Sequence, residues 1–308
     1  MGLAQKLSVE QNSAHLKAII SIQILFISIT GILICIPTAF IIFKKLKNSS
    51  ISTDLTILKI IILFDLFINF SLFTNYFLWY FPQNWLVYSN AWCRVQCILL
   101  TTPLLIGGYL ISLLSVERYL LIVFNKTLGK LTYQLLAALC IIYPLSVTSY
   151  FAGTDLVVLS ACGLYCTTTA TGLPINFGLY SSSMLGIVST LTTTWCYMGI
   201  SIFQVKQLSK NSNNLNLPKA EAIREATSTI LKSATILILY LLTHLGKTYV
   251  FVNEWITGQT RTIIADAITF NLLCYTGFID VMLFLNFNQE VKAELGRFML
   301  NLKNFRCF

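Results

Sequence analysis

Two carboxylates lie inside long apolar runs of this sequence. Asp65 falls in the stretch 55–80 and Asp280 in the stretch 263–286, both rich in Ile, Leu and Phe. An ionisable side chain in hydrocarbon costs roughly 3 kcal/mol or more, so a functional role is the default expectation for it. The two groups could share a cation or a proton. The alternative is that each is hydrogen-bonded separately inside a helix bundle.

A cysteine and an arginine mark the two ends of a third apolar run, 94–124. Cys93 stands 25 residues before Arg118, and a helix of that length covers roughly 37 Å, so the two side chains lie at opposite membrane surfaces. Cys93 would face an oxidising compartment, where it can form a disulfide. Arg118 would face the cytosol with Glu117 as an anionic neighbour. The alternative is an arginine that only extends its charge toward the headgroups.

Enzymatic chemistry has little support in the sequence. The chain holds two histidines, His15 and His244, and no Cys/His pair with metal-ligand spacing, phosphate-binding loop or nucleophile elbow. We therefore expect a protein that is not an enzyme and has no metal centre of this kind.

The composition indicates the environment of the elements that must position these residues. Of 308 residues, 56% are hydrophobic and 11% charged, and the mean hydropathy is +0.74. So few charges cannot cover a water-soluble globule of this size. A helix needs roughly 20 mainly apolar residues to cross a bilayer. The stretches that qualify are 19–43, 55–80, 94–124, 133–154, 175–205, 228–252 and 263–286. They predict an all-α membrane protein, a seven-transmembrane helix bundle.

Basic residues predict the orientation of this bundle. They are concentrated on alternate connecting segments and on the C-terminal residues 287–308, which the positive-inside rule places in the cytosol, with residues 1–18 outside. The cytosolic set is Lys44, Lys45, Lys47, Lys126, Lys130, Lys206, Lys210, Lys219, Arg224, Lys292, Arg297, Lys303 and Arg306, and the outer set is Lys6, Lys17, Arg94 and Arg261. The net charge of +9 thus belongs mainly to one membrane face, so no nucleic-acid partner is expected. The run 287–298 has apolar positions at helical spacing between basic residues, which predicts a short amphipathic helix on the inner leaflet lipids.

The run that begins at Cys93 resembles rhodopsin-like (class A) G protein-coupled receptors. Glu117-Arg118-Tyr119 matches their Asp/Glu-Arg-Tyr motif, and its distance from Cys93 matches that of their disulfide cysteine. Asp280 matches the Asn/Asp of their Asn/Asp-Pro-x-x-Tyr motif, although Val281 replaces the proline. The resemblance implies a plasma-membrane receptor that transmits an extracellular small-molecule signal to a heterotrimeric G protein.

The resemblance also implies a switch at the cytosolic end. There Glu117, Arg118 and Tyr119 would form the switch motif, and the arginine is released on activation to contact the G protein. Cys196-Tyr197 is similar to the Cys-Tyr of opsins, in which the tyrosine moves toward that arginine. In the middle of the membrane, the resemblance implies a sodium-binding or proton-linked site at Asp65 and Asp280.

Two acidic residues near the start of the span 228–252 are further candidates for this switch. Arg224-Glu225-Ala226-Thr227 is similar to the Lys-Glu-Val-Thr of opsins, which implies that Glu221 and Glu225 are partners of Arg118. Both are equally well explained as solvated charges.

The outward-facing cysteines are Cys93, Cys162 and Cys166, with Cys97 one turn further along. Ala161-Cys162-Gly163-Leu164 resembles a stretch of the second extracellular loop of opsins, which implies a disulfide between Cys93 and Cys162, and Cys166 is the alternative partner. Cys307 beside the basic C-terminal segment is a candidate for lipidation.

The resemblance places a ligand pocket in the outer half of the bundle. A retinal pigment needs a lysine in the span 263–286 and an amine receptor an aspartate seven residues after Cys93, but these positions are Cys274 and Leu100. Neither retinal nor a biogenic amine is therefore expected. The candidate lining residues are Leu100, Leu104, Tyr180, His244, Phe270 and Cys274. This mostly apolar set favours a small, fairly lipophilic ligand, although a histidine such as His244 is more often an ordinary bundle residue.

Several family residues are missing, and these departures keep two other functions open. The spans 175–205 and 228–252 lack the family's prolines, so a receptor-like protein that no longer couples is one alternative. The other is a seven-helix transporter or ion channel that uses Asp65 and Asp280, although no repeated halves are evident.

Overall fold

The structure is a computed structural model that describes residues 3–44, 53–81, 83–154, 156–168, 173–214, 219–259, 261–287 and 291–298. Helices make up nearly all of it, with one short β-hairpin. In chain order the elements are α1 (Leu3–Lys44), α2 (Thr53–Tyr80), α3 (Trp85–Tyr88), α4 (Asn90–Gln96), the π-helical turn η1 (Cys97–Thr101), α5 (Thr102–Phe124), α6 (Lys130–Gly153), β1 (Val157–Leu159), β2 (Cys166–Thr168), α7 (Leu173–Asn214), α8 (Lys219–Thr257), α9 (Ile263–Cys274) and α10 (Thr276–Phe287). Residues 291–298 are also helical.

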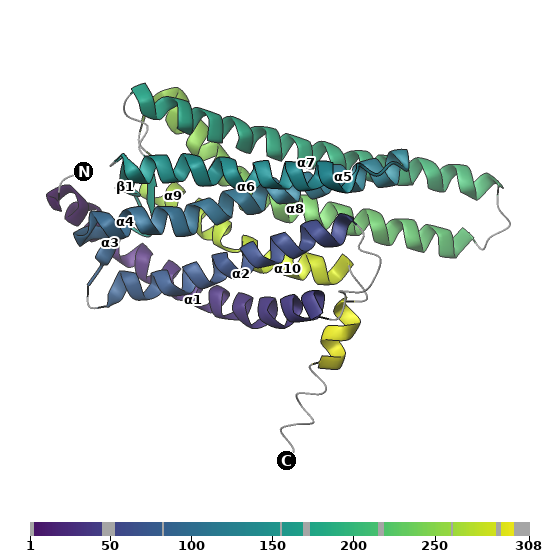
Figure 1. Ribbon diagram of the computed structural model, residues 1–308, viewed down its shortest axis with the longest axis horizontal. Helices are drawn as coiled ribbons and strands as arrows, with labels where there is room; N and C mark the ends of the chain where they lie inside the picture. The colour runs from purple at the N-terminus through teal and green to yellow at the C-terminus, as the bar shows by residue number, and fades with distance from the viewer. Residues whose placement is uncertain are drawn as a thin grey trace, which may run out of the picture.

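Seven long helical segments lie side by side along the molecule (Figure 1). Each is long and apolar enough to cross a membrane: Leu3–Phe43, Ile57–Tyr80, Asn90–Phe124, Lys130–Gly153, Ser183–Gln207, Ser233–Glu254 and Ile263–Leu285. Large apolar side chains point outward from them, and Phe26 and Trp195 are each 73% exposed. Such a surface is a liability in water but is solvated by lipid tails. The chain is therefore a multi-pass membrane protein, and the predicted seven-helix bundle is confirmed.

The segment Asn90–Phe124 is the central helix of the bundle. In its most apolar stretch 78% of the residues are buried, against 50% or less in the other six segments. Its main part, α5, packs against α2, α6 and α7. A side chain on this helix can therefore contact several neighbouring helices, which is why it can position residues of a site.

The π turn η1 changes which residues of this helix face inward. Pro103, at the start of α5, has no N–H to donate to the carbonyl of Leu99 four residues earlier. The hydroxyl of Ser71 on α2 donates to that oxygen instead, at 2.9 Å. Because a π turn contains one residue more than an α turn, the positions after it face the interior one residue later than in an unbroken α-helix.

The two ends of the bundle differ in structure. The short helices α3 and α4, the hairpin and the start of α1 gather at one end, which we call the disulfide end (Figure 1). At the opposite end α7 and α8 extend beyond the other helices, and the helix 291–298 lies there too. We call this the Arg118 end, because α5 runs toward it and terminates at Phe124.

The first helix begins at Leu3, so most of the segment 1–18, expected to precede it, forms its first turns. Polar residues of these turns have partners on the neighbouring loop. The ammonium of Lys6 donates to Asn90 Oδ1 at 2.7 Å, and the amide of Asn84 donates to Glu10 Oε1 at 3.1 Å. These contacts explain why the helix extends through a polar sequence.

The helix 291–298 packs on the Arg118 end of the bundle through its apolar side. Val291 is fully buried in a cluster with residues of α1, α2, α5, α6 and α10. The ring of Phe298 lies 6.1 Å from that of Phe40 on α1, measured between centroids. A short helix at the expected place is thus present, with an apolar face on the bundle.

Candidate functional site

A hairpin covers the disulfide end of the bundle, and it is held there by a disulfide bond. Strands β1 and β2 pair antiparallel, with Val157 opposite Thr168 and Leu159 opposite Cys166. Cys166 is bonded to Cys93 on α4, with Cα atoms 5.5 Å apart. The expected bond between Cys93 and Cys162 is wrong, and the alternative partner is the one used.

The position of Cys162 explains why it does not pair. Cys162 lies in the turn of the hairpin, where its backbone N–H donates to Asp266 Oδ2 at 3.2 Å and its thiol lies 3.3 Å from the Ser160 hydroxyl. The adjoining Gly163 has a φ of +70° and would bring a Cβ atom within 2.9 Å of Ser13 Oγ, so only glycine fits this turn against α1. Burial and the Asp266 carboxylate raise the pKa of the Cys162 thiol to about 12, so it stays protonated.

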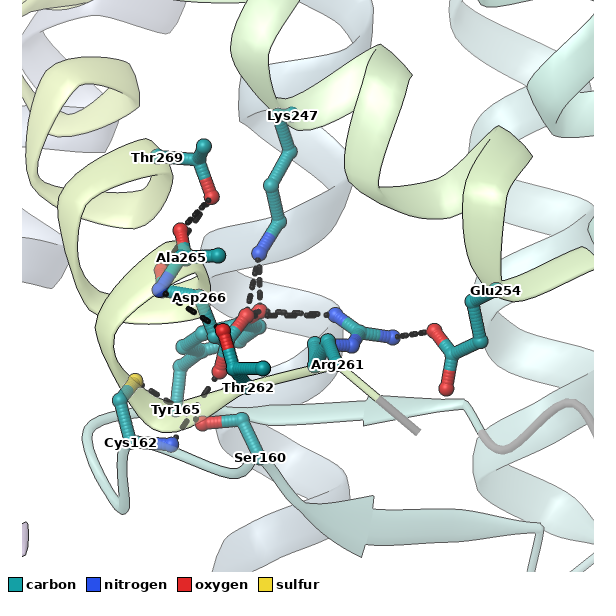
Figure 2. Close-up of polar contacts among 10 residues, drawn as sticks. All are labelled: Ser160, Cys162, Tyr165, Lys247, Glu254, Arg261, Thr262, Ala265, Asp266 and Thr269. Carbon is teal, nitrogen blue, oxygen red and sulfur yellow. Dashed lines mark hydrogen bonds and ion pairs between the residues drawn. The ribbon is translucent and has the colours of Figure 1, made fainter. Parts of the chain in front are cut away.

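A cluster of charged residues joins the hairpin to α8 and α9 (Figure 2). Asp266 lies at its centre, and its Oδ1 accepts from the Lys247 ammonium at 2.9 Å, from the Tyr165 hydroxyl at 2.5 Å and from the Arg261 guanidinium at 3.4 Å. Lys247 also donates to the Tyr165 hydroxyl. Arg261 makes a second ion pair, with Glu254 Oε2, at 2.5 Å. Three segments far apart in the chain therefore meet at one carboxylate.

This cluster, which we call the Asp266 cluster, is electrically balanced and buried. Two cations, Lys247 and Arg261, face two anions, Asp266 and Glu254, and each of the four side chains is 10% exposed or less. Burial and the neighbouring Asp266 raise the pKa of Tyr165 well above its usual value, so the phenol remains a hydrogen-bond donor. The balance is what allows four ionised groups to remain buried, because an unpaired charge there would be costly.

Beneath the Asp266 cluster the bundle encloses a first cavity of about 130 Å³. Lys247 and Tyr165 border it on the side of the cluster. Most of the remaining wall is apolar, and it includes Leu104, Leu105, Val147, Phe151, Phe270 and Leu273.

Three of the expected pocket residues, Leu104, His244 and Phe270, line this cavity. Leu100 and Cys274 are not among its lining residues, and both are fully buried in an apolar cluster that also contains Leu104 and Phe270. Thr101, the neighbour of Leu100 and the last residue of the π turn, does line the cavity. The side chain of Tyr180 lies outside the described residues.

His244 lines the first cavity, and one of its two ring nitrogens lacks a hydrogen-bond partner among the described residues. Its imidazole stacks on the ring of Tyr240, with centroids 4.4 Å apart, and it packs so closely on Gly108 that a Cβ atom there would lie 3.1 Å from Nε2. The Nδ1 atom is 2.8 Å from Thr243 Oγ1 and 3.3 Å from the carbonyl oxygen of Tyr240. The buried Nε2 atom has no hydrogen-bond partner among the described residues.

A second cavity of about 50 Å³ lies nearer the Arg118 end and contains both intramembrane carboxylates. Asp65 on α2 is 1% exposed, and Asp280 comes from α10. One oxygen of each, Asp65 Oδ1 and Asp280 Oδ2, has no partner among the residues that the structure describes. The structure therefore brings together two carboxylates that are 215 positions apart, around a space large enough for a water molecule or a small ion.

Arg118 and Tyr197 border the same second cavity. The guanidinium of Arg118 is hydrogen-bonded to the Tyr197 hydroxyl. Glu117 is buried at 3% exposure. Tyr119 contacts α7, because a Cβ atom on Gly199 would lie 2.4 Å from its ring.

The remaining expected site residues fall outside what the structure describes. Glu221 and Glu225 belong to the first turns of α8, but their side chains are not described, and neither is Cys307. The sequence interpretation in turn overlooked Lys247 and Asp266. Both are charged residues within apolar spans, the same signal that singled out Asp65 and Asp280.

Together the fold and the site define a class: a multi-pass membrane protein in which a disulfide-anchored hairpin covers an internal cavity of a seven-helix bundle. Comparison of the chain with models of known protein families, and with curated proteins, gives no match.

Proposed function

We propose that the protein is a plasma-membrane receptor that binds a small molecule in the first cavity and signals to a heterotrimeric G protein at the Arg118 end, as rhodopsin-like receptors do. The observation that carries the proposal is the position of Tyr240. This residue borders the first cavity, where it stacks on His244, and it also borders the second cavity, which contains Arg118. A ligand that displaces His244 therefore acts on a residue shared with the Arg118 region.

The distribution of charge supports an orientation with the N-terminus outside. Lys126 follows the end of α5, Lys130 begins α6, and Lys292 and Arg297 belong to the helix 291–298. These elements meet at the Arg118 end, the end that the positive-inside rule assigns to the cytosol (Figure 1). With that orientation the disulfide faces the oxidising compartment. The helix 291–298 then lies at the inner leaflet, where membrane lipid solvates its basic side.

The second cavity is the place for a coupled ion or proton. Two carboxylates with an unpartnered oxygen each repel one another when both are ionised, so the pair favours a shared proton or a sodium ion between them. The movement of Arg118 and Tyr197, which border the cavity, changes this balance. A sodium ion or proton here therefore regulates signalling rather than catalysing a reaction.

The test of this function is Arg118→Ala in receptor reconstituted in nanodiscs with purified heterotrimers of each G protein class. Wild-type receptor should accelerate nucleotide exchange above empty nanodiscs, and Arg118→Ala should lower the acceleration about tenfold or more, because the group that contacts the G protein is lost. Arg94→Ala, at the other end of the same helix, is the matched control and should exchange like wild type. If Arg118→Ala exchanges normally, the switch role is wrong.

The unpartnered oxygens of Asp65 and Asp280 also favour a second function, an ion relay. A transporter or channel would move sodium into proteoliposomes, and Asp65→Asn would abolish that flux. Flux of this kind without any nucleotide exchange would replace the receptor proposal.

A further inference from the structure

We propose that the first cavity recognises a neutral, single-ring compound that carries one hydroxyl group, a phenol or a ring alcohol, and that this hydroxyl donates a hydrogen bond to His244 Nε2. The effect of this binding on signalling rests on the proposed receptor function. The binding itself is a property of the cavity and can be measured without any G protein.

The hydrogen bonds around His244 determine which of its nitrogens carries the proton. The Thr243 hydroxyl lies 3.0 Å from the carbonyl oxygens of both Leu239 and Tyr240, so its single proton goes to the backbone. Thr243 Oγ1 and the Tyr240 carbonyl are then both acceptors for Nδ1, at 2.8 and 3.3 Å. Nδ1 therefore carries the proton, and Nε2 presents a lone pair.

That lone pair is an acceptor with no donor. Nε2 is buried, it belongs to an imidazole ring that lines the first cavity, and the described part of the chain supplies no partner for it. A buried polar atom without a hydrogen bond costs about 1–3 kcal/mol. A ligand that brings a hydroxyl to this atom recovers that cost, whereas one without a donor does not.

The hydroxyls that line the cavity nearby are already engaged. Ser189 Oγ is within 3.2 Å of the Gly108 carbonyl oxygen and 3.0 Å of the Tyr240 hydroxyl, and Thr190 and Thr248 donate to backbone carbonyls on their own helices. Among the described residues that line the cavity, His244 is the one with a buried side-chain atom that lacks a hydrogen-bond partner, so a donor aimed at His244 is the polar group that a ligand should supply. The rest of the ligand contacts apolar walls.

The size of the cavity limits the ligand to about one ring. A cavity of roughly 150 Å³ in another protein holds a benzene molecule, and the first cavity measures about 130 Å³. Phe270 and Phe251 are among its walls, and aromatic rings pack well against a planar ligand.

The charges at the border of the cavity favour a neutral ligand. The ammonium of Lys247 is compensated by Asp266 at 2.9 Å, and no carboxylate is among the residues described as lining the cavity. A ligand cation would find no counter-ion, and a ligand anion would compete with a carboxylate already in contact with Lys247. Either charge would be buried at a large cost.

The experiment compares 4-fluorophenol with 4-fluorotoluene, two rings of similar size of which only the first can donate a hydrogen bond. Binding to the full-length protein in nanodiscs is followed by fluorine NMR, with empty nanodiscs subtracting partition into lipid. We expect 4-fluorophenol to bind about tenfold more tightly, the factor that one net hydrogen bond gives.

Two variants test whether the preference for 4-fluorophenol depends on His244. His244→Phe keeps a ring but removes the acceptor, so the two probes should bind about equally. His15→Phe changes the other histidine of the chain, which is exposed on α1, and should keep the preference. Equal binding of the two probes to the wild type, no binding of either, or an unchanged preference in His244→Phe overturns the proposal.

A second measurement does not require the His244 variant to fold. In His15→Phe protein labelled with nitrogen-15 histidine, His244 gives the sole histidine signals, because the chain has two histidines. Its Nε2 resonance should shift on addition of 4-fluorophenol and stay in place with 4-fluorotoluene. A resonance that responds to neither probe contradicts the inference. Since neither measurement involves a G protein, this failure is distinct from a failure of the receptor function.

Discussion

At the scale of single residues, Asp266 connects the hairpin to α8 and to the segment before α9. It accepts hydrogen bonds from the hairpin turn, from Tyr165 before β2, from Lys247 on α8 and from Arg261 before α9. Its carboxylate has no exposed surface. One buried negative charge therefore contributes to holding the hairpin over the first cavity.

Asp266→Asn is expected to destabilise the protein strongly. The change leaves Lys247 and Arg261 buried with Glu254 as the remaining anion of the cluster. Breaking a buried ion pair costs about 3–5 kcal/mol, which should appear as a large drop in the melting temperature of detergent-purified protein. The double variant Lys247→Met/Asp266→Leu should recover part of that loss, since no unpaired charge remains.

The control for this prediction is an exposed ion pair. Arg297 lies 2.6 Å from Glu294, and its side chain is 70% exposed. Arg297→Ala should change the stability by about 0.5 kcal/mol or less. Equal melting temperatures for Asp266→Asn and Arg297→Ala would show that the Asp266 cluster contributes no stability.

Sequence alone located some of these residues and missed others for physical reasons. Asp65, Asp280 and Arg118 were identified because a charge within an apolar run is costly wherever its partners lie. The same rule applies to Lys247 and Asp266, yet their pairing depends on two helices meeting beneath a hairpin. The free lone pair of His244 depends on the direction of one hydroxyl, which no sequence pattern encodes.

At the scale of elements, the hairpin is positioned by the bond between Cys93 and Cys166 and by hydrogen bonds from the bundle. Gln96 on α4 accepts from the backbone N–H of Cys166 at 2.8 Å, and Trp79 on α2 donates to the carbonyl of Leu164 at 2.8 Å. The choice between Cys162 and Cys166 follows from this register, because β2 runs beside α4 while the turn points toward α9. Residue types near the two cysteines do not reveal that register.

Cys166→Ser should therefore lower the stability of the protein, and Cys162→Ser should leave the disulfide intact. Closing a loop of 73 residues restricts the unfolded chain, so removing the bond is expected to cost about 2–4 kcal/mol. The melting temperature of each variant and mass spectrometry of the unreduced peptides check this. A peptide that links Cys93 to Cys162 in the wild-type protein would contradict the observed pairing.

For the central helix, too, the sequence predicts the element but not its details. Its length and burial follow from composition, since Asn90–Phe124 is long and apolar. The π turn before Pro103 is not evident from the sequence, and its last residue, Thr101, lines the first cavity, whereas Leu100 does not. Composition thus predicts the helix but not this turn within it.

At the scale of the whole molecule, seven apolar runs were sufficient to predict the architecture, because each crossing depends on its own hydropathy. The ends of the helices were less predictable. The stretch 207–222 is polar and lacks the composition of a membrane crossing, yet α7 continues to Asn214 and α8 begins at Lys219. Outside the hydrocarbon, helix ends are decided by contacts and by water rather than by hydropathy.

An odd number of crossings places the two termini on opposite sides of the membrane, and in the proposed orientation the Arg118 end, with its basic residues, is cytosolic. An epitope tag before Leu3 should therefore bind antibody on intact cells, and a tag after Phe308 should bind only after permeabilisation.

Charge reversal tests the cause of this orientation. Changing Lys126 and Lys130 together to glutamate weakens the bias at one connecting segment, so the fraction of inverted molecules should rise while most keep the original orientation, because positive charge remains at Lys206, Lys292 and Arg297. Changing Lys6 and Lys17 instead should leave the orientation unchanged. Labelling of both tags on intact cells, or of neither, would mean that the number of crossings is even, and both the orientation and the receptor proposal would then be wrong.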